Sequence, residues 1–192
     1  MTDWTQLRYV VVDVEGNGQQ PPDLVELAAV PITGGVIGEP QTWLVRPDLP
    51  ITGFARKIHG ISNEQVADAP TFGHIEPAVL KALDADVLVA HAAHVDVGVL
   101  QRKLGDWECP EVFDTLKLAR RLLPDHDSYK LGSLADALSL VGDLSTRLKP
   151  HRATYDALIC ARLFVHLAGH HTLEELRDRP PEEDTGDAPS LF

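Results

Sequence analysis

Short apolar runs separated by glycine-containing turns make up the first quarter of the chain. Runs rich in Val, Leu and Ile predict strands at residues 9–15, 24–32 and 42–46. The segments 16–18 and 33–35 contain the glycines that tight turns favour, and each lies between two consecutive runs. This order predicts a three-stranded antiparallel meander.

Further along the chain, apolar residues recur every three or four positions, which is the spacing of one face of a helix. Two short apolar runs interrupt this pattern and predict additional strands. Three strands followed by alternating helices and strands predict an α/β fold, with a mixed sheet extended by parallel strands and helices on both faces. The expected helices are 63–68, 72–83, 95–104, 115–123, 133–140 and 153–168, and the expected strands are 87–90 and 112–114.

A single domain is expected, because a chain of 192 residues can bury a sizeable core. We place this domain at residues 1–176. From Arg177 onward, prolines, glycine and acidic residues predominate. That composition predicts a disordered acidic tail at residues 177–192.

The sequence predicts neither export nor membrane insertion. The N-terminus lacks the basic and apolar regions of a secretory signal. The longest apolar stretch, residues 87–100, is interrupted by two histidines and an aspartate. Cys109 and Cys160 have no metal-ligand spacing, so free thiols in a reducing compartment are expected. A cytoplasmic protein is therefore predicted.

The formal net charge of the chain is −12 at pH 7. This charge argues against a protein that coats nucleic acid through a broad basic surface. Much of it lies after residue 173, and cations would neutralise acidic metal ligands elsewhere. An acidic protein of this kind can still bind the phosphate of a strand end locally.

Two acids lie at the end of the first predicted strand, inside a run of valines. Asp13 and Glu15 are two positions apart, so their side chains share one face of the strand. The intervening valines point into the core. Two carboxylates on one face of a buried strand repel each other unless a cation lies between them. Carboxylate oxygens favour a hard cation, and Mg²⁺ or Mn²⁺ is expected.

Two later motifs complete a pattern. Asp96 follows a turn that contains two histidines, and His151 precedes Asp156 by five positions. Together with Asp13 and Glu15, these motifs resemble those of the DEDDh 3′→5′ exonucleases, which include the epsilon-type proofreading subunit of DNA polymerase III and ribonuclease T. The sister DEDDy group has a tyrosine four residues before the last aspartate, and this chain does not. The resemblance implies a ribonuclease-H-like fold.

The resemblance further implies two divalent cations, Mg²⁺ or Mn²⁺, as cofactors. Asp13 would bridge the two ions, with Glu15 and Asp156 on one. Asp96 would support the other ion. His151 would be the general base, because an unperturbed imidazole titrates near neutrality. The implied reaction releases 5′-nucleoside monophosphates from the 3′ ends of single-stranded DNA.

Several residues are candidate substrate contacts. Backbone amides at the glycine turn after the first strand would approach the terminal 3′-hydroxyl, since glycine permits close approach. Side chains of the segment 58–61 would flank the terminal base without selecting which base it is. The candidates are Gly16 and Asn17 for the hydroxyl, Ile58, His59 and Ile61 for the base, and Arg147, Lys149 and Arg152 for phosphates.

Two alternative functions remain open. The same chemistry on RNA, as in ribonuclease T or oligoribonuclease, is not distinguished by the sequence. A non-catalytic module that binds nucleic acid or a protein on the same fold would be expected to lack one of the carboxylates, and none is missing.

Two further motifs have structural interpretations. His91 and His94 have the H-x-x-H spacing of many zinc sites, but no third nitrogen or sulfur ligand is nearby, and we interpret them as turn residues that open a helix. Asp114 precedes a predicted helix, and we interpret it as the cap of that helix.

The C-terminal residues Ser190, Leu191 and Phe192 resemble the end of the peptides by which bacterial replication proteins dock on the sliding clamp. The preceding Ala188 and Pro189 depart from that motif. A solvated tail without a partner is the favoured interpretation, and docking on the clamp is the alternative.

Overall fold

Six strands form one mixed sheet in the computed structural model, which describes residues 3–142 and 144–177. Their order across the sheet is β3-β2-β1-β5-β6, and β4 also pairs with β2. The strands are β1 (Tyr9–Gly16), β2 (Leu24–Thr33), β3 (Val36–Ile37), β4 (Gln41–Leu44), β5 (Val87–Ala90) and β6 (Glu111–Asp114).

The antiparallel pair β1–β2 forms the centre of the sheet, with Val11 opposite Val30. Both β3 and β4 run antiparallel to β2, and they pair with its second and first half respectively. β5 runs parallel to β1, and β6 runs parallel to β5. The predicted meander with a parallel extension is confirmed, with β4 as its third strand and the short β3 as an additional strand that also pairs with β2.

The helices that the apolar spacing predicted are all present, with ends shifted by a few residues. The described part of the chain contains η1 (Trp4–Gln6), α1 (Gly53–His59), α2 (Asn63–Val66), α3 (Phe72–Ala82), α4 (His94–Leu104), α5 (Thr115–Leu122), α6 (Leu131–Ala137), α7 (Ala153–Ala168) and α8 (Leu173–Arg177).

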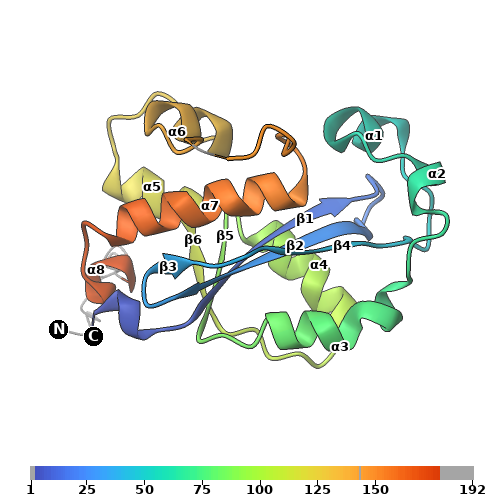
Figure 1. The fold of residues 1–192 in the computed structure, drawn as a ribbon, viewed down its shortest axis with the longest axis horizontal. Coiled ribbons are helices and arrows are strands. Elements are labelled where there is room, and N and C mark those ends of the chain that lie inside the picture. The colour runs from blue at the N-terminus through green and yellow to red at the C-terminus, as the bar shows by residue number, and fades with distance from the viewer. Residues whose placement is uncertain (1–2, 143, 178–192) are drawn as a thin grey trace, which may run out of the picture.

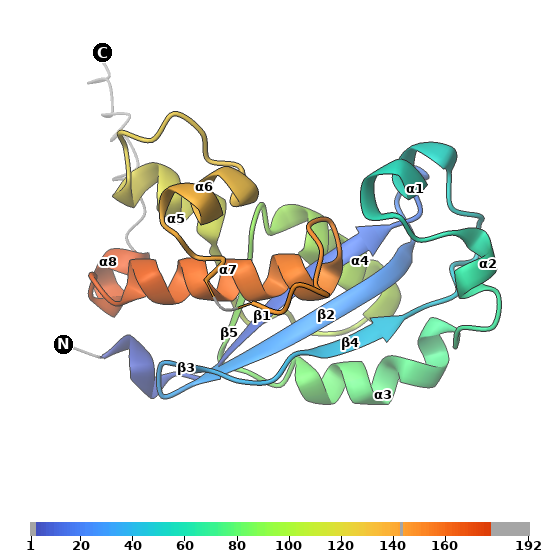
Figure 2. The same cartoon turned by 45° about the horizontal axis from the view of Figure 1, so that its top comes forward.

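Helices cover both faces of the sheet, as predicted. Figures 1 and 2 show α5, α6 and α7 over one face and α3 and α4 over the other. The side chains of β1 alternate accordingly. Tyr9 and Val11 belong to the core cluster that contains α7, whereas Val10 and Val12 belong to the cluster with α3 and α4. Asp13 is the next residue of the first series, so it faces α7.

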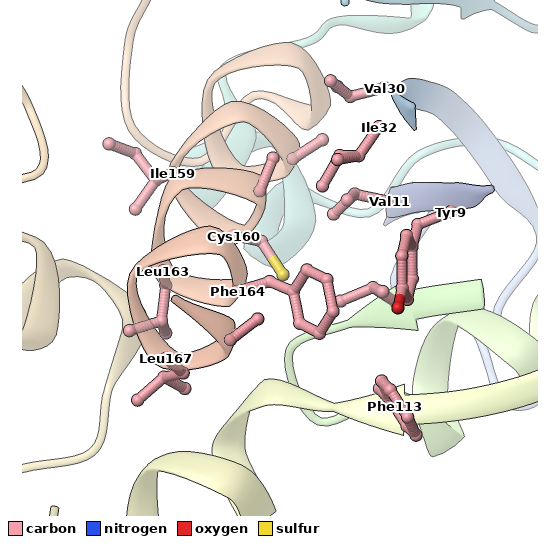
Figure 3. Packing of buried hydrophobic residues seen from close by; sticks show 14 of the residues in the cluster. Tyr9, Val11, Val30, Ile32, Phe113, Ile159, Cys160, Leu163, Phe164 and Leu167 are labelled. Atoms are coloured by element: carbon pink, nitrogen blue, oxygen red, sulfur yellow. The ribbon is translucent and has the colours of Figure 1, made fainter. Parts of the chain in front are cut away.

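Helix α7 forms the centre of the larger core. Ten of its sixteen residues are buried, as expected for a helix that packs between a sheet and other helices. Figure 3 shows Cys160 and Phe164 pointing from α7 toward the strands, and the ring of Phe164 lies 4.8 Å from that of Tyr9. This packing fixes the first turn of α7, which carries Asp156, relative to β1.

Four elements were not predicted: η1, β3, α1 and α8. Helix α1 illustrates the reason. Its large apolar residues Phe54 and Ile58 are 74% and 45% exposed, and only Ala55 and His59 are buried, so the helix lacks a broad apolar face directed at the core. It depends on its ends instead, because the Thr52 hydroxyl accepts from the Ala55 amide and Gly60 ends the helix with a φ of 75°.

The folded region extends to Arg177, which was assigned to the tail. This residue ends α8, and its guanidinium donates to the carboxylate of Glu111 at 2.7 Å. The rest of the predicted tail, with the clamp-like residues, lies outside the described residues. Both cysteines are free thiols, as expected. Among the described residues, no helix is long and apolar enough to cross a membrane.

Candidate active site

The carboxylates of β1 and α7 converge at the end of the sheet. Asp13 and Glu15 extend from β1 on the face that α7 covers, and Asp156 lies in the first turn of α7. Carboxylate oxygens of all three lie within 4.8 Å of one another. They are the one group of metal-ligating side chains with this spacing in the described part of the chain. The structure therefore brings together residues that are more than 140 positions apart in the sequence.

Asp96 approaches the same site from α4. Its side chain is only 5% exposed, and one carboxylate oxygen accepts a hydrogen bond from the Val14 amide at 3.0 Å. This bond fixes Asp96 to the strand that carries Asp13. Asp96 lies outside the group of three, so its role as a fourth metal ligand stays a prediction.

Burial and mutual repulsion make these acids hard to ionise. Burial raises the pKa of Asp13 well above its usual value, and the charges of Asp96 and Asp156 raise it further. The pKa of Glu15 is raised to about 8, first by burial and then by Asp156. Burial likewise raises the pKa of Asp96 to about 7. A cation would offset this cost, and an all-carboxylate donor set fits Mg²⁺ or Mn²⁺.

His151 lies in the loop that leads into α7. Its side chain is exposed, and it lines a cavity of about 620 Å³ together with Asp13 and Asp156. Its backbone has a φ of 59°, a left-handed conformation that is unfavourable for residues other than glycine. Such strain is often retained at functional sites because it aims a side chain. Its role as general base stays a prediction.

Glu26 was not among the predicted site residues, although it lies opposite Glu15 in the register of β1 and β2. It is 2% exposed and accepts hydrogen bonds from Arg152 Nε at 2.9 Å and from the Ala153 amide at 3.0 Å. An acid inside the apolar run of β2 was the sequence signal that could have identified it. Arg152 is thus engaged by an internal ion pair, and its predicted phosphate contact stays a prediction.

The loop after β1 differs in detail from the expectation. The Asn17 amide already donates to the carbonyl of Asp23 at 2.9 Å, and the Asn17 side chain is fully buried. Asn17 Oδ1 accepts from the amides of Gln19 and Asp23, so this residue organises the loop. The structure argues against an Asn17 amide that is available to a 3′-hydroxyl. For Gly16 the predicted contact stays a prediction.

The structure also distinguishes among the three candidates for contact with the terminal base. Ile61 is 1% exposed and packs in a small core cluster, so the structure argues against its predicted contact with a base. His59 is buried, with Nε2 3.3 Å from the Gly16 carbonyl and Nδ1 accepting from the Ile61 amide at 3.0 Å. It therefore supports the end of β1 from within. Ile58 is 45% exposed, and its contact with a base stays a prediction.

The histidine turn before α4 is held by internal hydrogen bonds. His91 Nδ1 lies 2.9 Å from the Thr115 hydroxyl, and Nε2 lies 3.0 Å from the Tyr129 carbonyl. His94 begins α4, as expected. Asp114 caps α5, as predicted, by accepting from the amide that follows Thr115. It also accepts from the two amides that follow His91, a second role that the sequence did not indicate.

A family model described as an exonuclease of the RNase T type matches residues 10–164. The chain belongs to this exonuclease family. Exodeoxyribonuclease 10 of Escherichia coli strain K12 is 36% identical over 170 residues, which cover 88% of this chain and 73% of the relative. The 3′-5′ exonuclease DinG of Bacillus subtilis is 34% identical over 180 residues, 90% of this chain but only 18% of the relative.

Other relatives are also much longer than this exonuclease domain. It spans 12% of the PolC-type DNA polymerase III of Caldanaerobacter subterraneus, at 34% identity. Among solved structures, exonuclease X in complex with 5′-overhanging duplex DNA is 33% identical, with a TM-score of 0.74 and coverage of 88% of this chain and 96% of that one.

The fold extends to a more distant solved structure. The nuclease domain of 3′hExo, described as a DEDDh family member bound to rAMP, has a TM-score of 0.71 at 18% identity, covering 89% of this chain and 96% of that one. The resemblance to DEDDh exonucleases and the ribonuclease-H-like fold are confirmed.

Proposed function

We propose that this exonuclease domain releases 5′-nucleoside monophosphates from the 3′ ends of single-stranded DNA, with two divalent cations as cofactors. The observation that supports it most is the convergence of Asp13, Glu15 and Asp156 within 4.8 Å. An exposed imidazole, that of His151, lines the same cavity. Clustered carboxylates beside a base are the groups that metal-assisted hydrolysis of a phosphodiester requires.

The four acids have different places in the proposed site. Asp13, Glu15 and Asp156 would hold one cation, and Asp96 would serve a second one beside Asp13. Bound cations would neutralise the charge of the phosphate and lower the pKa of a water molecule. The positions of the four acids are fixed by β1, by the first turn of α7 and, for Asp96, by the hydrogen bond from β1. Little reorganisation is then needed when substrate binds.

His151 takes the proton of the attacking water in this proposal. His151 and Asp156 line the same cavity, and the interaction with His151 opposes the rise in the pKa of Asp156 that burial causes. Because His151 is exposed, it can pass the proton to solvent before the next cycle. The Ile58 side chain would contact the terminal base, and Arg147 and Lys149, both exposed before His151, would contact phosphates.

The names of two relatives favour DNA over RNA. One is an exodeoxyribonuclease, and exonuclease X was solved with duplex DNA that has a 5′ overhang. Such a duplex has a recessed 3′ end, so it belongs among the test substrates. Single-stranded 3′ ends are preferred in this proposal because the carboxylates line a cavity that one unpaired strand would enter. A role in DNA repair or replication would follow.

The test is a degradation assay with 5′-labelled single-stranded DNA, matched RNA and recessed duplex DNA, each with Mg²⁺, Mn²⁺ or EDTA. We expect a ladder that shortens from the 3′ end, mononucleotide products and complete inhibition by EDTA. A 3′-phosphate should block the reaction, whereas a 5′ block should not. Cleavage of circular single-stranded DNA at a similar rate would contradict exonuclease action, and faster cleavage of RNA would transfer the proposal to RNA.

A further inference from the structure

The cavity that contains the catalytic side chains continues beyond them. Its catalytic end is formed by Asp13, His151 and Asp156, and its other end is formed by α5, α6 and the segment that joins them. Its volume of about 620 Å³ lies within the range of roughly 300–1,000 Å³ that is usual for ligand pockets. The carboxylate cluster alone therefore does not account for the whole cavity.

Two basic side chains lie at the far end of this cavity. Arg120 lies in the last turn of α5, and Lys130 immediately precedes α6. Both are exposed, and neither pairs with an acid of the described part of the chain. Two cations without an acidic partner therefore lie in the same cavity as part of the acidic centre. One acid, Asp136 of α6, also lines the cavity.

Hydrogen bonds of His91 fix the segment before α6 that carries Lys130. His91 connects it to the start of α5, because its two ring nitrogens contact the Tyr129 carbonyl at 3.0 Å and the Thr115 hydroxyl at 2.9 Å. The Tyr129 hydroxyl donates to the Leu123 carbonyl at 2.7 Å. These bonds define the position of the segment before α6, so the two cations are presented at a preformed surface.

The direction of the cavity suggests which part of a substrate occupies it. Figures 1 and 2 show α1 and α6 on opposite sides of the start of α7. The proposed function, on which this inference rests, assigns the terminal nucleotide to the side of α1, near Ile58. The rest of the strand must then leave the carboxylates toward α5 and α6.

We propose that Arg120 and Lys130 bind the phosphodiester backbone on the 5′ side of the scissile bond. Guanidinium and ammonium groups bind phosphate oxygens through charge-assisted hydrogen bonds. Half-buried Leu116, Leu131 and Tyr155 line the same cavity and offer apolar surface to the bases, a contact that tolerates any sequence. The cavity would thus bind the strand by charge and stacking, and catalysis would remain with the carboxylates.

The test compares Arg120→Gln, Lys130→Gln and the double variant on a single-stranded decamer with Mn²⁺. We expect KM to rise several-fold for each variant while kcat at saturation is unchanged. The plot of log(kcat/KM) against log[salt] should become shallower by about 0.7 per lost phosphate contact, about 1.4 for the double variant. Asp136→Asn should shift KM in the opposite direction, since it removes a repulsive charge.

Two controls make the result specific. Lys117→Gln removes an exposed lysine of the same helix that does not line the catalytic cavity but only the neighbouring one, which Arg120 also borders, so it should leave KM and the salt slope unchanged. A dinucleotide has no phosphodiester on the 5′ side of its scissile bond, so all variants should cleave it like the wild type. Unchanged KM and slope on the decamer, an equal effect on the dinucleotide, or an equal effect of Lys117→Gln would overturn the inference. A wild-type protein without metal-dependent activity would instead refute the proposed function.

Discussion

Asp13 has the least favourable position of any acid in the site, because its half-buried side chain lies among four other acidic side chains. Replacement by asparagine keeps the shape of the side chain and removes the charge. We expect Asp13→Asn to abolish exonuclease activity and yet to stabilise the metal-free protein by about 1 kcal/mol, roughly 2–4 °C in Tm.

The measurement is thermal unfolding with EDTA and with Mn²⁺, beside the activity assay. Wild-type protein should gain Tm on addition of Mn²⁺, and Asp13→Asn should gain much less because a central ligand is missing. An asparagine variant that is active, or that melts below the wild type in EDTA, would contradict the description of Asp13 as a repelled charge that a cation compensates.

Two predictions concern His151, one about its role in catalysis and one about its backbone conformation. His151→Ala should lower kcat by about 10²–10⁴-fold, the usual cost of losing a general base, while the Mn²⁺-dependent gain in Tm is retained. His151→Gly should be equally slow but more stable than His151→Ala, since glycine adopts the observed φ of 59° without strain. Activity and melting temperature of both variants check this. If kcat is unchanged in both, proton transfer belongs to another group.

At the scale of elements, the junction of β2 and α7 depends on one ion pair. Glu26 has a side-chain exposure of 3% and Arg152 one of 40%, so the two partners are not equivalent. Arg152→Ala leaves a buried carboxylate without its cation, and we expect a loss of about 3 kcal/mol of stability. Glu26→Gln leaves a half-exposed arginine that water can solvate, and we expect a loss of about 1 kcal/mol.

The double variant Glu26→Gln, Arg152→Ala should recover part of the loss that Arg152→Ala causes. Denaturant unfolding of the four proteins measures this coupling directly. Equal losses for the two single variants would be inconsistent with the difference in exposure. An Arg152→Ala variant with a raised KM and an unchanged stability would instead support the phosphate contact that the sequence suggested.

The elements that the sequence predicted best are those with the strongest periodicity. Strands β1 and β2 and helix α7 have long apolar patterns because the core contacts them along their whole length. Helix α1 has no such pattern, since Thr52 and Gly60 define its ends and its large apolar residues are exposed. Periodicity therefore does not predict short elements that depend on caps or on tertiary contacts.

At the scale of the whole molecule, the site joins segments that the sequence keeps apart. The pairing of Asp13 with Glu15 followed from strand geometry, because neighbours at i and i+2 share a face. The approach of Asp156 was implied only by the resemblance to a family, since no local pattern encodes a contact across 143 positions. The acid inside the apolar run of β2 could have pointed to Glu26, but not to its partner Arg152, which is distant in sequence.

The carboxylates also govern how the whole metal-free protein responds to pH. Folding raises the pKa of Glu15 from 4.5 to about 8 and that of Asp96 from 3.8 to about 7. Between roughly pH 4 and 8 the folded chain therefore binds more protons than the unfolded chain, and stability falls as pH rises. We expect the Tm in EDTA to decrease from pH 5 to pH 8.

Divalent cations should change this profile, because they replace protons as the partners of the acids. With saturating Mn²⁺ the Tm should stay level or rise over the same pH range. The double variant Glu15→Gln, Asp96→Asn is the matched control, since it removes two of the acids whose pKa folding raises and should make the decrease of Tm in EDTA smaller. Differential scanning calorimetry across this range checks the prediction. A Tm in EDTA that rises from pH 5 to pH 8 would mean that the acids are ionised and paired without a metal.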